Sequence, residues 1–483
     1  MYFPARKKYN MAKLVNAFCD DALGTLDAVG VAEAIASGKI SAAEATEAAI
    51  QRAEKVNGEL NAIVYKTYES ARENARTKHA GLLSGVPTFI KDNEPVKGIP
   101  TQLGTLAFKA KPAKKNGKYV NQFLSTGLNS LGKSTMPEFG FICSTENPKW
   151  GITRNPWDTD YTPGGSSSGS AAMVTSGVVP IAVANDGAGS TRIPASCCGL
   201  IGLKPSRGRL MNAEGTDILP VNIVYEGVLT RSVRDTAAFY AAAEKYHRNP
   251  TLPELGNITH AGQKRLKIVF FDNIPEGKLG HQDDATYNTQ LSTAKLLSSL
   301  GHEVDQLAFP PFDISALSTD FLNYYGLLAF ALSSLGTLVL DSKPDKSQLE
   351  PFTLGLSNQF KRNFTGIRKS IKRLQAAGRT MEAFFDKYDV IMTPVLAHSV
   401  PPIGHFSPDL SYEEVSQRAV SFASFTGLQN VSGAPAISIP SGTSDEGLPI
   451  GMHFIAPFGQ ERRLIELAYE IEEAKPWRFV YNS

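Results

Sequence analysis

The sequence reads Asn185-Asp186-Gly187-Ala188-Gly189-Ser190-Thr191-Arg192-Ile193-Pro194-Ala195 at its most informative point. This stretch follows an apolar run, Gly177 to Ala184, with the length and content of a buried strand in an α/β sheet. The small residues 187–189 can turn successive backbone N–H groups toward one point, as an oxyanion hole requires. The pattern is typical of a serine nucleophile at a strand end, or of a glycine turn in which Ser190 caps a helix.

A second serine cluster precedes this stretch, in the segment Pro163-Gly164-Gly165-Ser166-Ser167-Ser168-Gly169. Residues 165–169 match Gly-x-Ser-x-Gly, the nucleophile elbow of α/β-hydrolases, which would make Ser167 the nucleophile. That elbow needs a hydrophobic strand immediately before it. The polar segment Arg154 to Pro163 cannot form a central strand. We therefore expect that Ser167 is not the nucleophile.

A lysine, Lys91, ends the apolar run Gly85-Val86-Pro87-Thr88-Phe89-Ile90, which predicts a buried strand. Burial there would lower the pKa of the lysine and leave a neutral amine available as a base. The alternative is a lysine whose tip reaches solvent. Because no histidine occurs between His79 and His247, a base near the serine turns is either this lysine or a residue from elsewhere in the fold.

Strand and helix patterns alternate along the whole chain, which predicts a layered α/β protein. Further strands are expected at Leu266–Phe271, Glu303–Leu307, Asp389–Thr393 and Ala436–Pro440. Helices are expected at Asp27–Ser37, Ser41–Val56, Val120–Leu131, Ser170–Ser176, Ser232–Glu244, Thr286–Leu300 and Glu461–Ala474. The helices after Ser41 and Ser232 open on capping boxes.

The organisation of the chain favours one large domain. No repeat of 20–50 residues and no low-complexity linker divides it, so we expect a single domain over residues 1–483. Residues 1–20 are expected to form an N-terminal extension. They lack the apolar stretch of a signal peptide, and we expect a cytoplasmic protein that is a monomer or a homodimer.

The global composition excludes several classes of function. The 49 basic and 47 acidic residues leave a net charge of +2, so there is no electrostatic case for a nucleic-acid partner. Four cysteines are too few for a disulfide framework in 483 residues, and the neighbours Cys197 and Cys198 lack metal-ligand spacing. We expect no metal. The uncharged segment Phe321–Leu340 is long enough to span a membrane, but its polar residues favour a buried or pocket-lining pair of helices.

Three separated blocks together resemble the amidase signature family. They are Lys91, the turn Gly164 to Ser167, and the stretch Asp186 to Ala195. The resemblance continues through Cys198–Pro205, Asn430–Pro440 and Gly447–Gly451, and covers residues 26 to 475. It implies the fold of that family, a large mixed β-sheet covered by helices on both faces.

The resemblance also implies roles for individual residues. Ser190 would be the nucleophile, Ser166 a bridging serine that follows a cis peptide bond, and Lys91 the general base. The oxyanion hole would consist of four backbone N–H groups, those of Gly187, Ala188, Gly189 and Ser190. Asp186 and Arg192 would support the loop. The resemblance implies neither a metal nor an organic cofactor.

One departure from the family concerns Ala188, which stands where glycine is usual. A methyl group there restricts φ but leaves the N–H free. This variant, and the stretch Cys198–Arg209, are similar to the subgroup of 6-aminohexanoate cyclic-dimer hydrolases. The resemblance therefore implies a hydrolase that cleaves C–N bonds of small neutral amides or lactams through an acyl-enzyme. The same chemistry extends to esters and carbamates (urethanes).

Two other functions remain open. The glutaminase subunit of a tRNA-dependent amidotransferase shares the triad, but it has glutamine where this chain has Ile193, which cannot make polar contacts. A non-catalytic binding protein is the second, and the intact serines and lysine argue against it. For a hydrolase, we expect pocket walls from Met136–Phe141, Asn212–Ile223 and Phe321–Leu340, and neutral, partly apolar substrates.

Overall fold

The centre of the computed structural model is one mixed β-sheet. The structure describes residues 13–77, 80–271, 282–308, 310, 314–336 and 342–482. Eleven strands follow the order β1-β3-β2-β6-β8-β7-β12-β13-β11-β9-β10. Their bounds are β1 Ile63–Lys66, β2 Pro87–Lys91, β3 Asn129–Ser134, β6 Ile181–Asp186, β7 Ile201–Lys204, β8 Tyr225–Thr230, β9 Lys267–Phe271, β10 Glu303–Leu307, β11 Val390–Pro394, β12 Ala436–Thr443 and β13 Pro449–Ile455. β4 (Glu146–Asn147) and β5 (Gly151–Ile152) form a separate pair.

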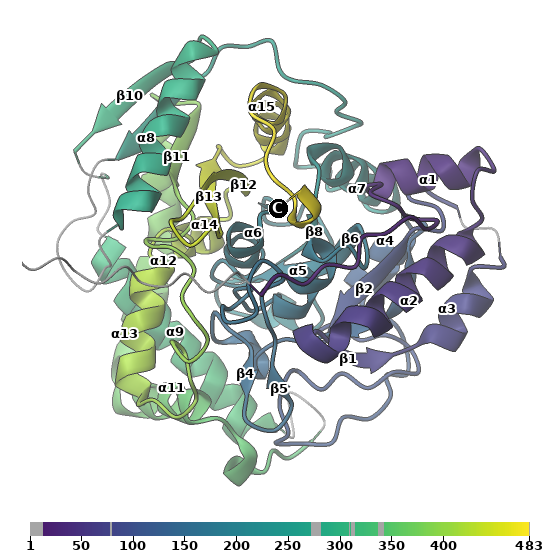
Figure 1. Cartoon of the computed structure of the whole chain (residues 1–483). Helices are drawn as coiled ribbons and strands as arrows, with labels where there is room; N and C mark the ends of the chain where they lie inside the picture. The colour runs from purple at the N-terminus through teal and green to yellow at the C-terminus, as the bar shows by residue number, and fades with distance from the viewer. Residues whose placement is uncertain are drawn as a thin grey trace, which may run out of the picture.

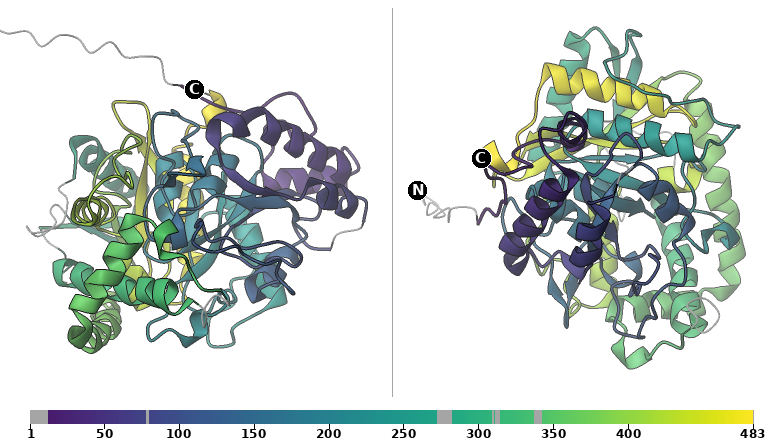
Figure 2. Two further views of the ribbon diagram at one scale, coloured as in Figure 1. Left: turned by 90° about the horizontal axis from the view of Figure 1, so that it is seen from below. Right: turned by 90° about the vertical axis from the view of Figure 1, so that its right-hand side faces the viewer.

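Helices cover both faces of this sheet, as predicted (Figure 1). They are α1 Ala28–Ala36, α2 Ala42–Leu60, α3 Tyr68–Asn74, α4 Lys118–Leu124, α5 Ser168–Thr175, α6 Arg192–Cys198, α7 Val233–Tyr246, α8 Asp284–Ser299, α9 Ile314–Ser334, α11 Pro351–Arg362, α12 Ile367–Phe384, α13 Tyr412–Phe422, α14 Gly427–Ser432 and α15 Glu461–Ala474. Short 3-10 helices lie at Glu138–Gly140, Thr216–Ile218, Lys346–Gln348, Phe364–Gly366 and Val480–Asn482. In Figure 2, α9 and α11 lie on the side opposite α1, α2 and α3.

The strand directions place the catalytic candidates at one edge. β2 pairs in parallel with β3 and β6, while β6, β8, β7, β12 and β13 pair antiparallel in sequence across the centre. The carboxyl ends of parallel strands meet at the same edge of a sheet. Lys91, the last residue of β2, therefore lies beside Asn185 and Asp186, the last residues of β6.

Of the two predicted capping boxes, the one at Ser41 is present in full and the one at Ser232 only in part. The Ser41 box is confirmed, because the Glu44 N–H donates to Ser41 Oγ at 3.1 Å and the Ser41 N–H donates to Glu44 Oε2 at 2.7 Å. Ser232 does accept from the Asp235 N–H, at 3.3 Å. The Asp235 carboxylate, however, accepts from the N–H groups of residues 28 and 29. It thus ties the start of α7 to the start of α1, so the predicted second box is half right.

Two element boundaries differ from the prediction. The helix expected over Val120–Leu131 ends at Leu124, because the chain turns at Gly127, whose φ is +98°, and enters β3. β3 gains ladder partners on both sides, β1 and β2, which a continued helix could not have. The strand expected over residues 177–184 is β6, shifted to Ile181–Asp186. Strands β9 to β12 lie where they were predicted, within three residues at each end.

The last part of the expected N-terminal extension, residues 13–20, is described by the structure. Residues 1–12 lie outside the described residues. Val15 and Ala17 are buried in the main core, and their N–H groups donate to the carbonyls of Pro156 and Ser176. The chain therefore joins the core before residue 20.

The uncharged segment begins inside a helix. Residues 321–334 belong to α9, where Tyr324 and Ala329 are fully buried. Residues 337–340 of the expected pair of helices lie outside the described residues. Within the part of the chain that is described, no helix has the length and apolarity needed to cross a bilayer.

Candidate active site

The structure brings Lys91 together with two of the three serines of the second cluster, Ser166 and Ser167. Lys91 is fully buried, and its Nζ donates to Ser166 Oγ at 2.7 Å and to Ser167 Oγ at 3.0 Å. It also donates to Asn185 Oδ1. A protonated lysine has three N–H donors, and all three are used here. The lysine is therefore held in one position, with its nitrogen on the hydroxyl of Ser166.

The surroundings of Lys91 lower its pKa from 10.5 to about 7. Burial is the largest cause because it disfavours the charged form, while the carboxyl groups of Glu226, Asp186 and Glu94 raise the pKa and oppose it. At neutral pH the ammonium and the free amine are thus both populated. A group in that state can accept a proton and return it.

Ser166 and Ser167 have different surroundings although they are adjacent. The peptide bond before Ser166 is cis. Ser167 is fully buried, and its hydroxyl donates to the backbone carbonyl of Ser190 at 2.6 Å. The Ser167 hydroxyl therefore anchors the Ser190 loop. Ser190, 7% exposed, lines a cavity, which is where a nucleophile meets a substrate.

One of the four N–H groups predicted to form the oxyanion hole already has an acceptor within the loop. The Gly189 N–H donates to Asp186 Oδ1 at 2.7 Å, so it is not available to a substrate. Gly189 has a φ of +127°, and a Cβ there would lie 2.5 Å from Thr426 Oγ1. Within the described residues, the N–H groups of Gly187, Ala188 and Ser190 have no hydrogen-bond acceptor. Three donors of the predicted four remain.

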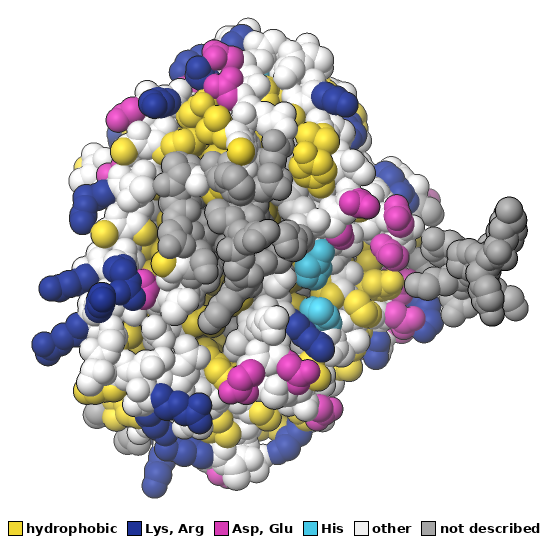
Figure 3. Space-filling view, turned by 90° about the vertical axis from the view of Figure 1, so that its left-hand side faces the viewer, with side chains coloured by type: hydrophobic (Ala, Val, Ile, Leu, Met, Phe, Trp, Pro, Cys, Tyr) yellow, Lys and Arg dark blue, Asp and Glu magenta, His cyan; other side chains and the backbone are white. Residues whose placement is uncertain are grey.

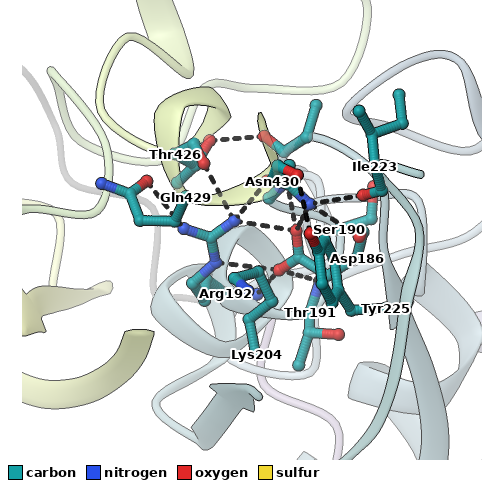
Figure 4. Close-up of polar contacts among 12 residues, drawn as sticks. Asp186, Ser190, Thr191, Arg192, Lys204, Ile223, Tyr225, Thr426, Gln429 and Asn430 are labelled. Carbon is teal, nitrogen blue, oxygen red and sulfur yellow. Dashed lines mark hydrogen bonds and ion pairs between the residues drawn. The ribbon is translucent and has the colours of Figure 1, made fainter. Parts of the chain in front are cut away.

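A buried ion pair lies directly under this loop (Figure 4). Arg192 and Asp186 are both fully buried, and two N–H groups of the guanidinium reach the carboxylate at 2.8 and 2.9 Å. Burial alone would raise the pKa of Asp186, but Arg192 holds it well below its usual range. The same carboxylate accepts from the N–H groups of Gly189 and Thr191. The ion pair thus fixes the backbone of the loop.

Helix α14 completes this support with residues to which the sequence assigned no role. The Asn430 side chain donates to the Asp186 carbonyl and accepts from Arg192, both at 2.7 Å. Arg192 also donates to the Thr426 carbonyl at 2.9 Å, and Thr426 Oγ1 donates to the Ala188 carbonyl at 2.5 Å. Asn430 is the first residue of the block Asn430–Pro440 that resembles the family, and this resemblance could have indicated its importance. Thr426 lies outside those blocks and gave none.

The cavity beside Ser190 is apolar. It contains about 1260 Å³ of space, including its open mouth, and no described residue in its wall carries a charged side chain. Gly140, Phe141 and residues of α9 contribute to the wall, as predicted. The segment Asn212–Ile223 does not, because Val221 and Ile223 pack beneath α9. Figure 3 shows the side of the molecule that lies on the left in Figure 1. Most of the lysine and arginine side chains in this view lie near its outer edge.

Comparisons with known proteins show the family to which the chain belongs. A family model described as Amidase matches residues 44–465. The Mycobacterium leprae protein named "Putative amidase AmiC" is 48% identical over 96% of this chain and 98% of its own. The 6-aminohexanoate-cyclic-dimer hydrolase of Paenarthrobacter ureafaciens is 31% identical over 93% and 95% of the two chains. A solved structure of 6-aminohexanoate cyclic dimer hydrolase with its substrate superposes with a TM-score of 0.85, at 28% identity over 95% and 98%. The chain belongs to the amidase family.

Proposed function

We propose that this protein hydrolyses C–N bonds of small neutral amides or lactams, with Ser190 as nucleophile, Ser166 as bridge and Lys91 as base. The observation that carries the proposal is the 2.7 Å hydrogen bond between buried Lys91 and Ser166. Ser190 lines the cavity, and its backbone carbonyl accepts from Ser167, the residue next to Ser166. A lysine with a pKa of about 7 supplies the base that a serine nucleophile needs.

In the proposed reaction the proton moves along this relay. Neutral Lys91 takes the proton of Ser166, which takes the proton of Ser190 as its Oγ attacks the carbonyl carbon. The carbonyl π electrons move to oxygen, where the free N–H groups of the loop stabilise the charge. Collapse breaks the C–N bond, and the relay returns the proton to the leaving amine. Water enters the acyl-enzyme by the same steps and releases the acid.

The cavity favours neutral substrates with apolar groups. Free glutamine carries a charged α-amino and a charged α-carboxyl group, which would need ionic partners in the cavity. The described residues of the wall supply none. Ile193, which lines the cavity, takes the place of the amidotransferase glutamine. The similar cyclic-dimer hydrolases carry the name of a lactam substrate, which supports lactams among the substrates here. Esters and carbamates meet the same requirements, since the relay and loop act on any tetrahedral centre of this kind.

The test is a panel of neutral anilides, lactams, esters, carbamates and glutamine. We expect kcat/KM for at least one neutral amide or lactam to exceed that for glutamine by more than tenfold. A fluorophosphonate should label Ser190 in the wild type and nothing in Ser190→Ala. Faster turnover of glutamine would overturn the substrate class, and labelling at Ser167 would overturn the assignment of the nucleophile.

A further inference from the structure

The wall of the cavity contains one tyrosine among its described residues, Tyr325. Tyr325 belongs to α9 and lines the same cavity as Ser190 and Ala188. Its neighbour Tyr324 exchanges hydrogen bonds with the backbone of Val221. The Tyr325 hydroxyl has no hydrogen-bond partner among the described residues. The side chain is half-buried and the hydroxyl is not one of the buried polar atoms without a partner, so it is open to a ligand in the cavity.

Aromatic packing fixes where this hydroxyl points. The ring of Tyr325 packs against those of Phe141 and Phe321, with ring centroids 5.5 and 5.1 Å away. Two contacts of this kind restrict the orientation of the ring. The hydroxyl is therefore prepositioned, and a substrate would not have to order it.

The oxygen of Tyr325 reaches the oxyanion loop. A Cβ built on Gly187 would lie 3.2 Å from Tyr325 Oη and would meet no other atom within 4 Å. Gly187 does not have a positive φ, so its backbone would accept alanine. The glycine at this position therefore leaves room for the tyrosine hydroxyl next to a free loop N–H.

We propose that the Tyr325 hydroxyl is a side-chain donor of the oxyanion hole. The proposal rests on the hydrolytic function proposed above. The loop lacks one of the expected backbone donors, because the Gly189 N–H is bonded to Asp186. Tyr325 Oη then joins the N–H groups of Gly187, Ala188 and Ser190 around the oxygen of the reacting carbonyl.

The chemistry of this contact is donation without proton transfer. Burial is the largest cause that raises the pKa of Tyr325 well above its usual range, and the negative charge of Asp186 adds to it, so the phenol keeps its proton. As the carbonyl oxygen becomes an oxyanion, its hydrogen bond to the phenol strengthens. The bond weakens again when the C–N bond breaks. Such a donor stabilises the transition state more than the bound substrate.

The experiment compares Tyr325→Phe with its matched control Tyr324→Phe, on the best neutral amide of the panel. We expect Tyr325→Phe to lower kcat roughly 10- to 100-fold with KM within twofold of the wild type, as for loss of one oxyanion donor. Tyr324→Phe should leave kcat within twofold, because its hydroxyl serves the backbone of Val221. A rise in KM at unchanged kcat, or no change in either, would overturn the proposal.

A second variant tests the approach at the loop. Gly187→Ala should displace the hydroxyl and lower kcat, and adding it to Tyr325→Phe should cost little more, since both remove the same contact. If the fold-losses in kcat of the two single variants multiply in the double variant, the two changes do not remove the same contact. Fluorophosphonate labelling of the wild type separates the two proposals. If Ser190 is labelled and Tyr325→Phe is fully active, only the Tyr325 role fails, whereas an unlabelled Ser190 removes the proposed function itself.

Discussion

Two buried charged clusters flank the Ser190 loop, and they are built in opposite ways. The anchor cluster, Asp186, Arg192 and Asn430, uses its carboxylate and guanidinium groups in mutual hydrogen bonds. In the relay cluster, Lys91, Glu94 and Glu226, no N–H or hydroxyl donor among the described residues reaches Glu94 Oε2 or either oxygen of Glu226. The two carboxyl groups instead pair with each other. The difference indicates that the first cluster holds a fixed charge and the second exchanges protons.

The pKa values follow the same division. In the anchor cluster Arg192 keeps the carboxyl of Asp186 ionised, so its charge does not change in the neutral range. In the relay cluster burial raises the pKa of Glu94 to about 7 and that of Glu226 well above its usual range. Glu226 also faces Asn185, the acceptor of Lys91, across the β6–β8 ladder. The negative charge of one carboxylate disfavours ionisation of a second carboxyl group beside it. We therefore expect Glu94 and Glu226 to share one negative charge.

The largest expected effect is a loss of catalysis when Lys91, the base of the proposed proton relay, is removed from the relay cluster. Lys91→Ala should lower kcat roughly 10⁴- to 10⁶-fold, about as much as Ser190→Ala, because the relay acts as a unit. The double variant should be little worse than either single variant. Steady-state kinetics with the best amide of the panel measure all three. If the two losses multiply, Lys91 and Ser190 do not share a proton path.

Breaking the anchor cluster should act on stability instead. Arg192→Ala leaves the buried carboxylate of Asp186 without its cation, at an expected cost of about 3–5 kcal/mol in the free energy of unfolding. Urea unfolding at pH 7 measures this. The control is Arg234→Ala, which breaks a partly exposed pair with Asp27 and should cost no more than about 1 kcal/mol. Equal losses in the two variants would mean that the anchor cluster has no special role.

The sequence predicted those parts of the site that depend on neighbours along the chain. Ser190 after a buried run and Lys91 at the end of another are local patterns, and both lie where they were expected. The use of the Gly189 N–H by Asp186 was not predictable in the same way. It depends on a loop conformation that Thr426 and Asn430 fix from the far end of the chain.

The same limit applies to the fold. The α/β class and strands β9 to β12 were predictable because their apolar runs are bounded by polar turns. Strand β3 was read as the end of a helix, because only its pairing with β1 and β2 shows it to be a strand. Glu226 follows the same rule. Nothing near it in sequence indicates that its carboxyl group lies close to Lys91.

A smaller effect should come from changing the charge of the relay cluster. In the wild type, kcat/KM should rise with pH through the Lys91 pKa of about 7, because the ammonium form cannot accept a proton. Glu226 and Glu94 favour that ammonium form. Replacing both with glutamine should therefore lower the pKa of Lys91 and move the acid limb to lower pH by about one unit. Either single replacement should shift it less, since the remaining carboxyl group can carry the charge. An acid limb that stays in place, or moves upward, in the double variant would show that these carboxyl groups do not act on Lys91.

The smallest expected effect concerns Ser167, whose hydroxyl connects Lys91 to the Ser190 loop. Its hydroxyl accepts from Lys91 at 3.0 Å and donates to the Ser190 carbonyl at 2.6 Å, yet it is fully buried away from the cavity. Ser167→Ala removes a positioning contact and leaves the relay atoms in place, so we expect kcat to fall no more than about tenfold, with about 1 kcal/mol lost in stability. Fluorophosphonate should still label Ser190, as mass spectrometry of the labelled peptide can show. Complete loss of activity together with loss of the label would mean that Ser167, and not the relay through Ser166, carries the reaction.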